Sequence, residues 1–187
     1  MKDLVLKNRS YRRFDERHKL NQELLHELVD CARLTATGMN KQALKYYSSW
    51  AKDTNDKIFD TLGWAGYLTD WAGPGAGERP TGYVVILGDK NITENFGCDH
   101  GIAAQTILLA AAEQDLGGCM IGSVRRAKLR ESLKLPEQLE ILLVIALGKP
   151  NETVVLDEVK DDDIKYWRDD DGVHHVPKRP LREVLIH

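Results

Sequence analysis

The stretch that decides the fold is "DHGIAAQTILLAAAEQDLGGCMIGS", residues 99–123. Its apolar residues lie on almost every side of a helix, which predicts a helix that begins with Asp99 as its cap and stops at Gly117. A helix with so little polar surface is buried, either in the core of a domain or in a contact between subunits. The segment that follows, "GCMIGS", is predicted to be a short strand or an extended link.

Apolar runs on both sides of this helix predict two buried strands, "GYVVILGD" at 82–89 and "LEILLVIALGKP" at 139–150. Helical spacing of apolar residues predicts two further helices. One lies in "LNQELLHELVDCARLTAT" at 20–37, where Asn21 is the N-cap, and an amphipathic one lies in "RRAKLRESLKLP" at 125–136.

The chain after Pro150 changes in character, and an Asp-Gly pair in "DDDGVHHVP", residues 169–177, predicts a β-hairpin. The order of elements indicates an α+β fold, in which a few strands are layered against helices. Because helices separate the predicted strands, a parallel α/β sheet is the alternative.

The composition favours one globular domain spanning 1–187, since 42% of the 187 residues are apolar and 29% are charged. A net charge of −3 argues against general nucleic-acid binding, which needs a basic surplus. We expect no transmembrane helix, and the apolar stretch in "MKDLVLKNRS" is too short for a signal peptide. The three cysteines suit free thiols in a reducing cytosol, which predicts a cytoplasmic protein.

The N-terminal stretch "KNRSYRRF" places Arg9, Ser10 and Arg12 close together. Guanidinium groups pair bidentately with phosphate or carboxylate oxygens, so this stretch is a candidate site for one small anion. A solvated basic turn is the alternative.

Two glycine-containing stretches are candidates for contacts with a flat ligand. In "TATGMNKQ" the side chains of Thr37, Asn40 and Gln42 can donate and accept hydrogen bonds, as carbonyls and ring nitrogens require. In "LGGCMIGS" the glycines at 117, 118 and 122 leave backbone amides open to close approach. An ordinary loop after a helix and a tight turn after a strand are the alternatives.

Metal binding and thiol catalysis are both disfavoured. His174 and His175 are adjacent on a predicted strand and therefore point to opposite faces, so they cannot easily share one ion. Cys119 is expected to be a buried, inert thiol. We predict no metal site and no dedicated catalytic side chain.

Five segments, taken in order, resemble the nitroreductase family of FMN-dependent NAD(P)H oxidoreductases. They are similar to the family's Arg-Ser-x-Arg-x-aromatic motif, its Asn-x-Gln loop, its central helix with Leu-Gly-x-Cys-x-Ile-Gly, its strand ending in Leu-Gly-x-Pro, and its basic tail. In this chain the segments are "RSYRRF", "ATGMNKQ", "GIAAQTILLAAAEQDLGGCMIG", "LPEQLEILLVIALGKP" and "KRPLREVL".

The resemblance implies a central antiparallel or mixed sheet flanked by helices, and an extended C-terminal tail exchanged in a homodimer. It also implies FMN at the subunit interface and hydride transfer from NADH or NADPH through FMN to a nitroaromatic, a quinone or a similar electrophile. The residues that it assigns to FMN are Arg9, Ser10, Arg12, Thr37, Asn40, Gln42, Met120, Ile121, Gly122, Ser123, Lys178 and Arg179.

The chain departs from the family pattern at Asn8, where many members have arginine, and at Ala36, where the usual residue is proline. The segment from Trp50 to Pro80 is unusual, and its aromatic residues are predicted either to form a lid over the substrate or to pack in the core. Two other functions stay open at this point: a flavin carrier or flavin-modifying protein without NAD(P)H turnover, and an Arg-rich module that binds an acidic partner.

Overall fold

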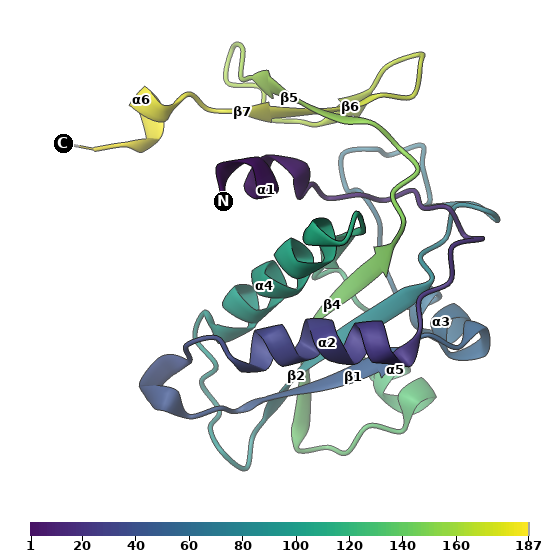
Figure 1. Cartoon of the computed structure of the whole chain (residues 1–187), viewed down its shortest axis with the longest axis vertical. Helices are drawn as coiled ribbons and strands as arrows, with labels where there is room; N and C mark the ends of the chain where they lie inside the picture. Colours follow the sequence, from purple (N-terminus) through teal and green to yellow (C-terminus); the bar gives the residue numbers. More distant parts are fainter. Residues whose placement is uncertain (187) are drawn as a thin grey trace.

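The computed structural model describes residues 1–186 (Figure 1). The helices are α1 (Lys2–Lys7), α2 (Gln22–Arg33), α3 (Lys52–Phe59), α4 (Asp99–Glu113), α5 (Arg126–Leu133) and α6 (Leu181–Val184), with a short 3₁₀ turn at Gly38–Asn40. The strands are β1 (Leu44–Ser49), β2 (Gly82–Asp89), β3 (Gly117–Ile121), β4 (Leu139–Gly148), β5 (Val154–Glu158), β6 (Trp167–Arg168) and β7 (His174–Lys178).

The central sheet has four strands in the order β1-β2-β4-β3, and every neighbouring pair is antiparallel. The two long apolar strands, β2 and β4, lie in the middle, as expected for runs buried on both faces. The prediction of an α+β fold is confirmed. The alternative of a parallel α/β sheet is wrong, because β2, β3 and β4 run antiparallel to their neighbours although helices separate them in sequence.

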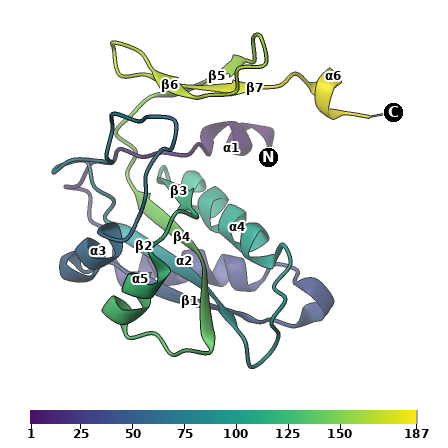
Figure 2. The same cartoon turned by 180° about the vertical axis from the view of Figure 1, so that it is seen from behind.

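Helices cover both faces of this sheet (Figures 1 and 2). Alternate residues of β2 point to opposite sides, so Val84 and Ile86 pack against α2 and α4, whereas Tyr83 and Val85 pack against α3 and α5. The core is therefore two layers of buried apolar side chains with the sheet between them.

The helix predicted around residues 99–117 is present as α4 and is buried as expected, but its ends differ. It ends at Glu113, and Gly117, which was predicted to end it, is instead the first residue of β3. Its N-cap is Cys98 and not Asp99. The carboxylate of Asp99 instead accepts a hydrogen bond from the backbone N–H of Gly38, at 2.9 Å, and so ties the loop after α2 to α4.

Two predicted chain features are confirmed in detail. Asn21 caps α2, since its Oδ1 accepts a hydrogen bond from the Leu24 N–H at 2.9 Å. The Asp-Gly turn joins β6 to β7, and Gly172 adopts a φ of +78°, a left-handed conformation that glycine accommodates without strain. Together with β5, which pairs parallel to β7, this hairpin forms a second sheet of three strands.

Residues 8–14, here called the strap, run across β3 and β4 and join α1 to the main body. Ser10 forms a bridge with Gly118, and Phe14 forms one with Pro150. The side chain of Tyr11 occupies the space where a Cβ of Gly117 would lie. The expectation that the amides of Gly117 and Gly118 are open to a flat ligand is therefore wrong, because the strap itself packs against them.

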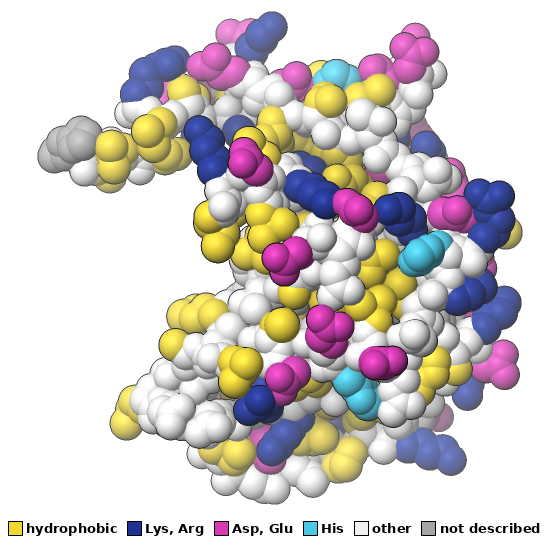
Figure 3. Space-filling view, viewed as in Figure 1, with side chains coloured by type: hydrophobic (Ala, Val, Ile, Leu, Met, Phe, Trp, Pro, Cys, Tyr) yellow, Lys and Arg dark blue, Asp and Glu magenta, His cyan; other side chains and the backbone are white. Residues whose placement is uncertain are grey.

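The second sheet lies above α1 and the strap, and the chain after it leads away from the body as α6 (Figure 1). Hydrophobic side chains of this tail are exposed, with Leu181 at 70% and Val184 at 61% of their full accessible surface (Figure 3). Within residues 1–186, each helix is too short or too polar to cross a bilayer.

Candidate functional site

A cavity of about 400 Å³ lies between the strap, α4, β3 and the second sheet. Its volume is within the range of sites for small molecules and cofactors. Its walls combine cations and amides with apolar side chains. The lining residues are Asn8, Arg9, Ser10, Arg12, Gln105, Leu108, Met120, Val154, Tyr166, His174, Val176 and Lys178.

The cavity is positively charged. It is lined by Arg9, Arg12 and Lys178, whereas no Asp or Glu of the described chain lines it. Within residues 1–186 none of these three cations forms an ion pair with a carboxylate. The side chain of Arg9 instead donates to backbone carbonyls, from Nε to Asn8 at 2.6 Å and from Nη2 to Val5 at 2.5 Å. Uncompensated cations in a partly enclosed site favour an anionic ligand.

The carboxylate of Glu152 contacts the strap, and its side chain is only 1% exposed. Its Oε1 accepts hydrogen bonds from the backbone N–H groups of Arg12 and Arg13. Its Oε2 accepts from Arg168 Nη2 at 2.9 Å. Burial lowers the pKa of Arg168 even though Glu152 opposes the shift. The negative charge of Glu152 is thus paired with Arg168, and no described carboxylate forms an ion pair with the guanidinium of Arg12.

His174 is completely buried on β7 and lies beside Arg12. Its Nε2 is 3.1 Å from Arg12 Nη1. Burial, together with the positive charge of Arg12, lowers the pKa of His174 to about 4. The imidazole is therefore neutral at pH 7.

Tyr166 forms one wall of the cavity and connects it to the Trp50–Pro80 segment. The guanidinium carbon of Arg12 lies 4.8 Å from the centroid of the Tyr166 ring. The centroid of the Tyr67 ring lies 4.9 Å from the same point. Tyr67 itself is 48% exposed. The guanidinium carbon of Arg168 lies 4.3 Å from the centroid of the Trp71 ring, and Trp71 packs edge-to-face against Trp64. Of the aromatic residues in the Trp50–Pro80 segment, Tyr67 contacts the cavity wall, whereas Trp64 and Trp71 pack against each other.

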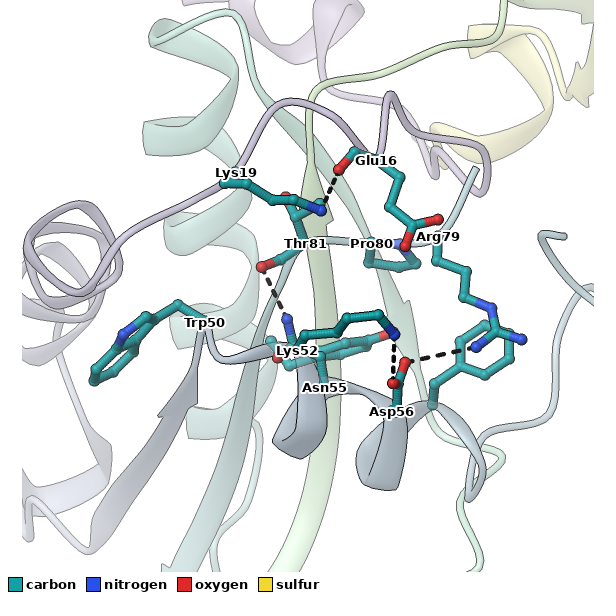
Figure 4. Close-up of a pocket in the computed structure, with 11 residues that line it drawn as sticks. Glu16, Lys19, Trp50, Lys52, Asn55, Asp56, Arg79, Pro80 and Thr81 are labelled. Atoms are coloured by element: carbon teal, nitrogen blue, oxygen red, sulfur yellow. Dashed lines mark hydrogen bonds and ion pairs between the residues drawn. The ribbon is translucent and has the colours of Figure 1, made fainter. Parts of the chain in front are cut away.

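A second cavity, of about 150 Å³, lies between the loop that follows the strap, α3 and the start of β2 (Figure 4). Three of its charged groups pair with one another: the Asp56 carboxylate lies 2.6 Å from Lys52 Nζ and 3.6 Å from Arg79 Nη1. Asn55 Nδ2 donates to the Thr81 carbonyl at 2.9 Å. The carboxylates of Glu16 and Asp56 thus line this cavity together with its cations, whereas the larger cavity has no carboxylate of the described chain in its lining.

The two adjacent histidines face opposite sides of β7, as predicted. His175 lies on the outer face, where its Nδ1 is 2.8 Å from Asp157 and its Nε2 is 3.1 Å from Asp169. Residues 1–186 contain no group of three or more His, Cys, Asp or Glu side chains arranged to hold a metal ion. Cys119 is buried, as expected, and burial raises the pKa of its thiol.

Comparison with known proteins agrees with this architecture. Residues 69–149 match the model of the Nitroreductase family. A nitroreductase family protein from Streptococcus pneumoniae superposes with a TM-score of 0.71 at 11% identity, over 99% of this chain and 98% of that one. The chain has the nitroreductase fold.

A second solved structure is similar over most of its length, and a curated relative is similar over a short segment. An FMN-dependent nitroreductase from Clostridium difficile has a TM-score of 0.66 at 22% identity, over 87% of this chain and 92% of that one. A curated relative, the NADPH-flavin oxidoreductase of Vibrio harveyi, is 45% identical over 56 residues. This match spans 29% of the present chain and only 23% of the relative's length.

The nitroreductase fold brings together five of the residues that the sequence assigned to FMN, namely Arg9, Ser10, Arg12, Met120 and Lys178. Arg179 does not line the cavity, because its guanidinium pairs with Asp162 at 2.7 Å and with Glu183 at 3.2 Å. The cavity also contains residues that the sequence did not single out as ligands, namely Asn8, Gln105, Tyr166 and His174.

The remaining predicted residues lie elsewhere in the same chain. Thr37 and Gln42 line a separate cavity of about 340 Å³ beside β1, and Asn40 is exposed in the same loop. Ile121 is buried in the core layer on the α3 and α5 side. Gly122 and Ser123 are exposed after β3, where the Ser123 carbonyl accepts a hydrogen bond from the Gly63 N–H at 2.8 Å.

Proposed function

We propose that this protein is an FMN-dependent oxidoreductase that transfers hydride from NADH or NADPH, through FMN, to a nitroaromatic, a quinone or a similar electrophile. The observation that carries the proposal is the cavity lined by three cations and by no carboxylate of the described chain. The names of two similar proteins, an NADPH-flavin oxidoreductase and an FMN-dependent nitroreductase, support it.

The donors that line the cavity fit FMN. Cationic side chains and a serine hydroxyl suit a phosphate, so Arg9, Ser10 and Lys178 would hold this end of the cofactor. Leu108 and Met120 supply apolar surface for a flat ring. When bound, FMN supplies the capacity to accept a hydride and to pass it on.

The protein's own contribution is orientation and charge. Arg12 would place a positive charge beside the part of the ring that gains negative charge on reduction, and such a charge stabilises the reduced form. Its guanidinium is already fixed, since Nη1 donates to the Ser10 carbonyl at 3.2 Å and the group lies over Tyr166. A fixed charge needs little reorganisation during the reaction.

A homodimer would complete this site. Thr37, Asn40 and Gln42 lie apart from the cavity in one chain, so they would reach FMN only from a second copy. Exposed apolar side chains on α4 and on the α6 tail, such as Ile102 and Leu181, offer surface for this contact. We propose a cytoplasmic homodimer with FMN at the interface and with the C-terminal tails exchanged.

The proposal is tested by the visible absorption spectrum of the purified protein, with FMN added and unbound flavin removed by dialysis. We expect bound flavin, and bleaching of its absorption by NADH or NADPH without oxygen. Arg12→Met should weaken FMN binding by about tenfold or more. The matched control Arg17→Met removes an exposed arginine that pairs with Asp15 and lines neither of these cavities, and it should leave binding unchanged. A wild-type protein that takes up no FMN contradicts the proposal, and bound flavin that neither nucleotide bleaches points to a flavin carrier.

The placement of FMN between two copies has its own test. Arg12→Met and Asn40→Ala should each damage both sites of a homodimer, whereas a mixed dimer of the two variants contains one intact site. Statistical subunit exchange makes about half of the dimers mixed, and each mixed dimer has one intact site of two, so we expect about a quarter of the wild-type FMN binding to be restored. A mixture that binds no more FMN than the single variants places all the ligands within one chain.

A further inference from the structure

The contact between His174 and Arg12 is not explained by stability alone. His174 is fully buried, and its Nδ1 has no hydrogen-bond partner within residues 1–186. A buried, unpartnered N–H group destabilises a fold, so an apolar side chain would be the more stabilising choice at this position. The imidazole therefore contributes something that an apolar residue cannot, and among the described residues its ring makes a polar contact with Arg12 alone.

The chemistry of the two groups fixes the direction of this contact. A guanidinium has only donors, so Arg12 Nη1 donates and His174 Nε2 accepts across 3.1 Å. The accepting nitrogen carries no proton, and the single proton of the neutral ring is on Nδ1.

We infer that His174 is a positioning residue, which holds the guanidinium of Arg12 toward the cavity while leaving its positive charge available to an anionic ligand. A carboxylate in the same place would hold the guanidinium equally well, but it would cancel the charge. The buried carboxylate of Glu152 is paired with Arg168 and with backbone N–H groups of the strap instead. The inference rests on the proposed function for the identity of the ligand, FMN, but not for the contact itself.

The contact is tested first without flavin, by ¹⁵N NMR of histidine-labelled protein at pH 7. The signals that disappear from the spectrum in the His174→Gln variant are those of His174. We expect a neutral ring with the proton on Nδ1, and an Nε2 signal that shifts when Arg12 is replaced in Arg12→Met. A charged ring, a proton on Nε2, or a spectrum that Arg12→Met does not change overturns the inference.

The effect on the ligand is tested by FMN affinity and by the flavin midpoint potential. His174→Gln keeps a neutral acceptor and should bind FMN within about threefold of wild type, whereas His174→Leu should bind about tenfold more weakly. His174→Asp keeps an acceptor but adds negative charge, so its midpoint potential should be lower than that of His174→Gln. His26→Leu, a histidine of α2 that packs on Trp50 outside the cavity, is the matched control.

These outcomes distinguish the positioning role of His174 from the proposed FMN-dependent function. Equal affinity and potential in the Gln, Leu and Asp variants overturn the positioning role even if wild-type protein binds FMN. If wild-type protein binds no FMN, the proposed function fails, and the histidine spectrum still decides the contact between His174 and Arg12. Should His174→Leu fail to fold, the comparison of Gln with Asp and the Arg12→Met spectrum remain decisive.

Discussion

Replacing Glu152 by alanine should destabilise the protein more than the loss of any exposed ion pair. The substitution leaves Arg168, whose side chain is 11% exposed, without its partner, and it also removes the acceptor for the backbone N–H groups of Arg12 and Arg13. Breaking a buried pair by removing one partner costs about 3–5 kcal/mol. Because small proteins are stable by only about 5–15 kcal/mol, this loss is a large fraction of the total.

The measurement is urea unfolding followed by circular dichroism, with Asp30→Ala as the control. Asp30 pairs with Arg33 on the surface of α2, where the two side chains are 56% and 63% exposed, so its loss should cost less than about 1 kcal/mol. Glu152→Gln keeps an oxygen for the backbone N–H groups and should fall between the two. It also provides a value if Glu152→Ala does not fold.

A second comparison tests the physical reason. Removing Arg168 together with Glu152, as in Glu152→Gln with Arg168→Met, should cost less than the sum of the single changes, because no buried charge is then left unpaired. Strict additivity, or a Glu152→Ala variant as stable as Asp30→Ala, would show that the pair is not buried as described.

Three further predictions concern other parts of the chain. Gly118→Ala should lower the free energy of unfolding in urea by about 1–3 kcal/mol, because its Cβ would lie 2.7 Å from Leu108 and also against the Ala146 carbonyl. Gly75 has open space around it, so Gly75→Ala should change this free energy by less than about 1 kcal/mol. Equal effects of the two substitutions would contradict the packing described for Gly118. Hydrogen bonds with Asp169 and Asp157 raise the pKa of His175, so its stabilising contribution is complete below pH 6.5 and is lost as the pH rises through the raised value. The stability difference between wild type and His175→Gln should therefore shrink from about pH 6 to pH 9, and a difference that does not change with pH refutes this. Deleting residues 181–187 should produce monomers in sedimentation and weaken FMN binding, and a truncated protein that still dimerises would place the interface elsewhere.

How far the sequence predicts the fold depends on how much of each element is buried. The long apolar runs of β2 and β4 are visible in the sequence because both faces of these strands are covered. The strand β1 and the helix α3 were not predicted. β1, with the sequence "LKYYSS", is an edge strand that is only partly buried, and α3 buries just Asn55 and Ile58, so neither has a clear apolar period.

Spacing along the chain pointed to the candidate site only where its residues are neighbours in sequence, whereas Met120 and Lys178 were assigned through the family resemblance. Arg9, Ser10 and Arg12 lie close together in the sequence, and the structure places them in the lining of one cavity. Glu152 and His174 become partners of the strap only because strands far along the chain fold back over it. Such contacts depend on strand pairing and register, which composition and spacing do not specify.

The register of β7 explains how a chain with a net charge of −3 keeps a cationic cavity. Alternate residues of a strand point to opposite faces, so His174, Val176 and Lys178 line the cavity, whereas His175 and Pro177 line a groove on the outer face that is rich in aspartates. A shift of one residue would exchange the two sets: it would remove Lys178 from the cavity and place His175 beside Arg12. The ion pairs of His175 with Asp157 and Asp169 oppose that shift, because both carboxylates are on the outer side. The acidic groups that give the chain its net charge thus help to hold the strand in the register that keeps the cavity positive.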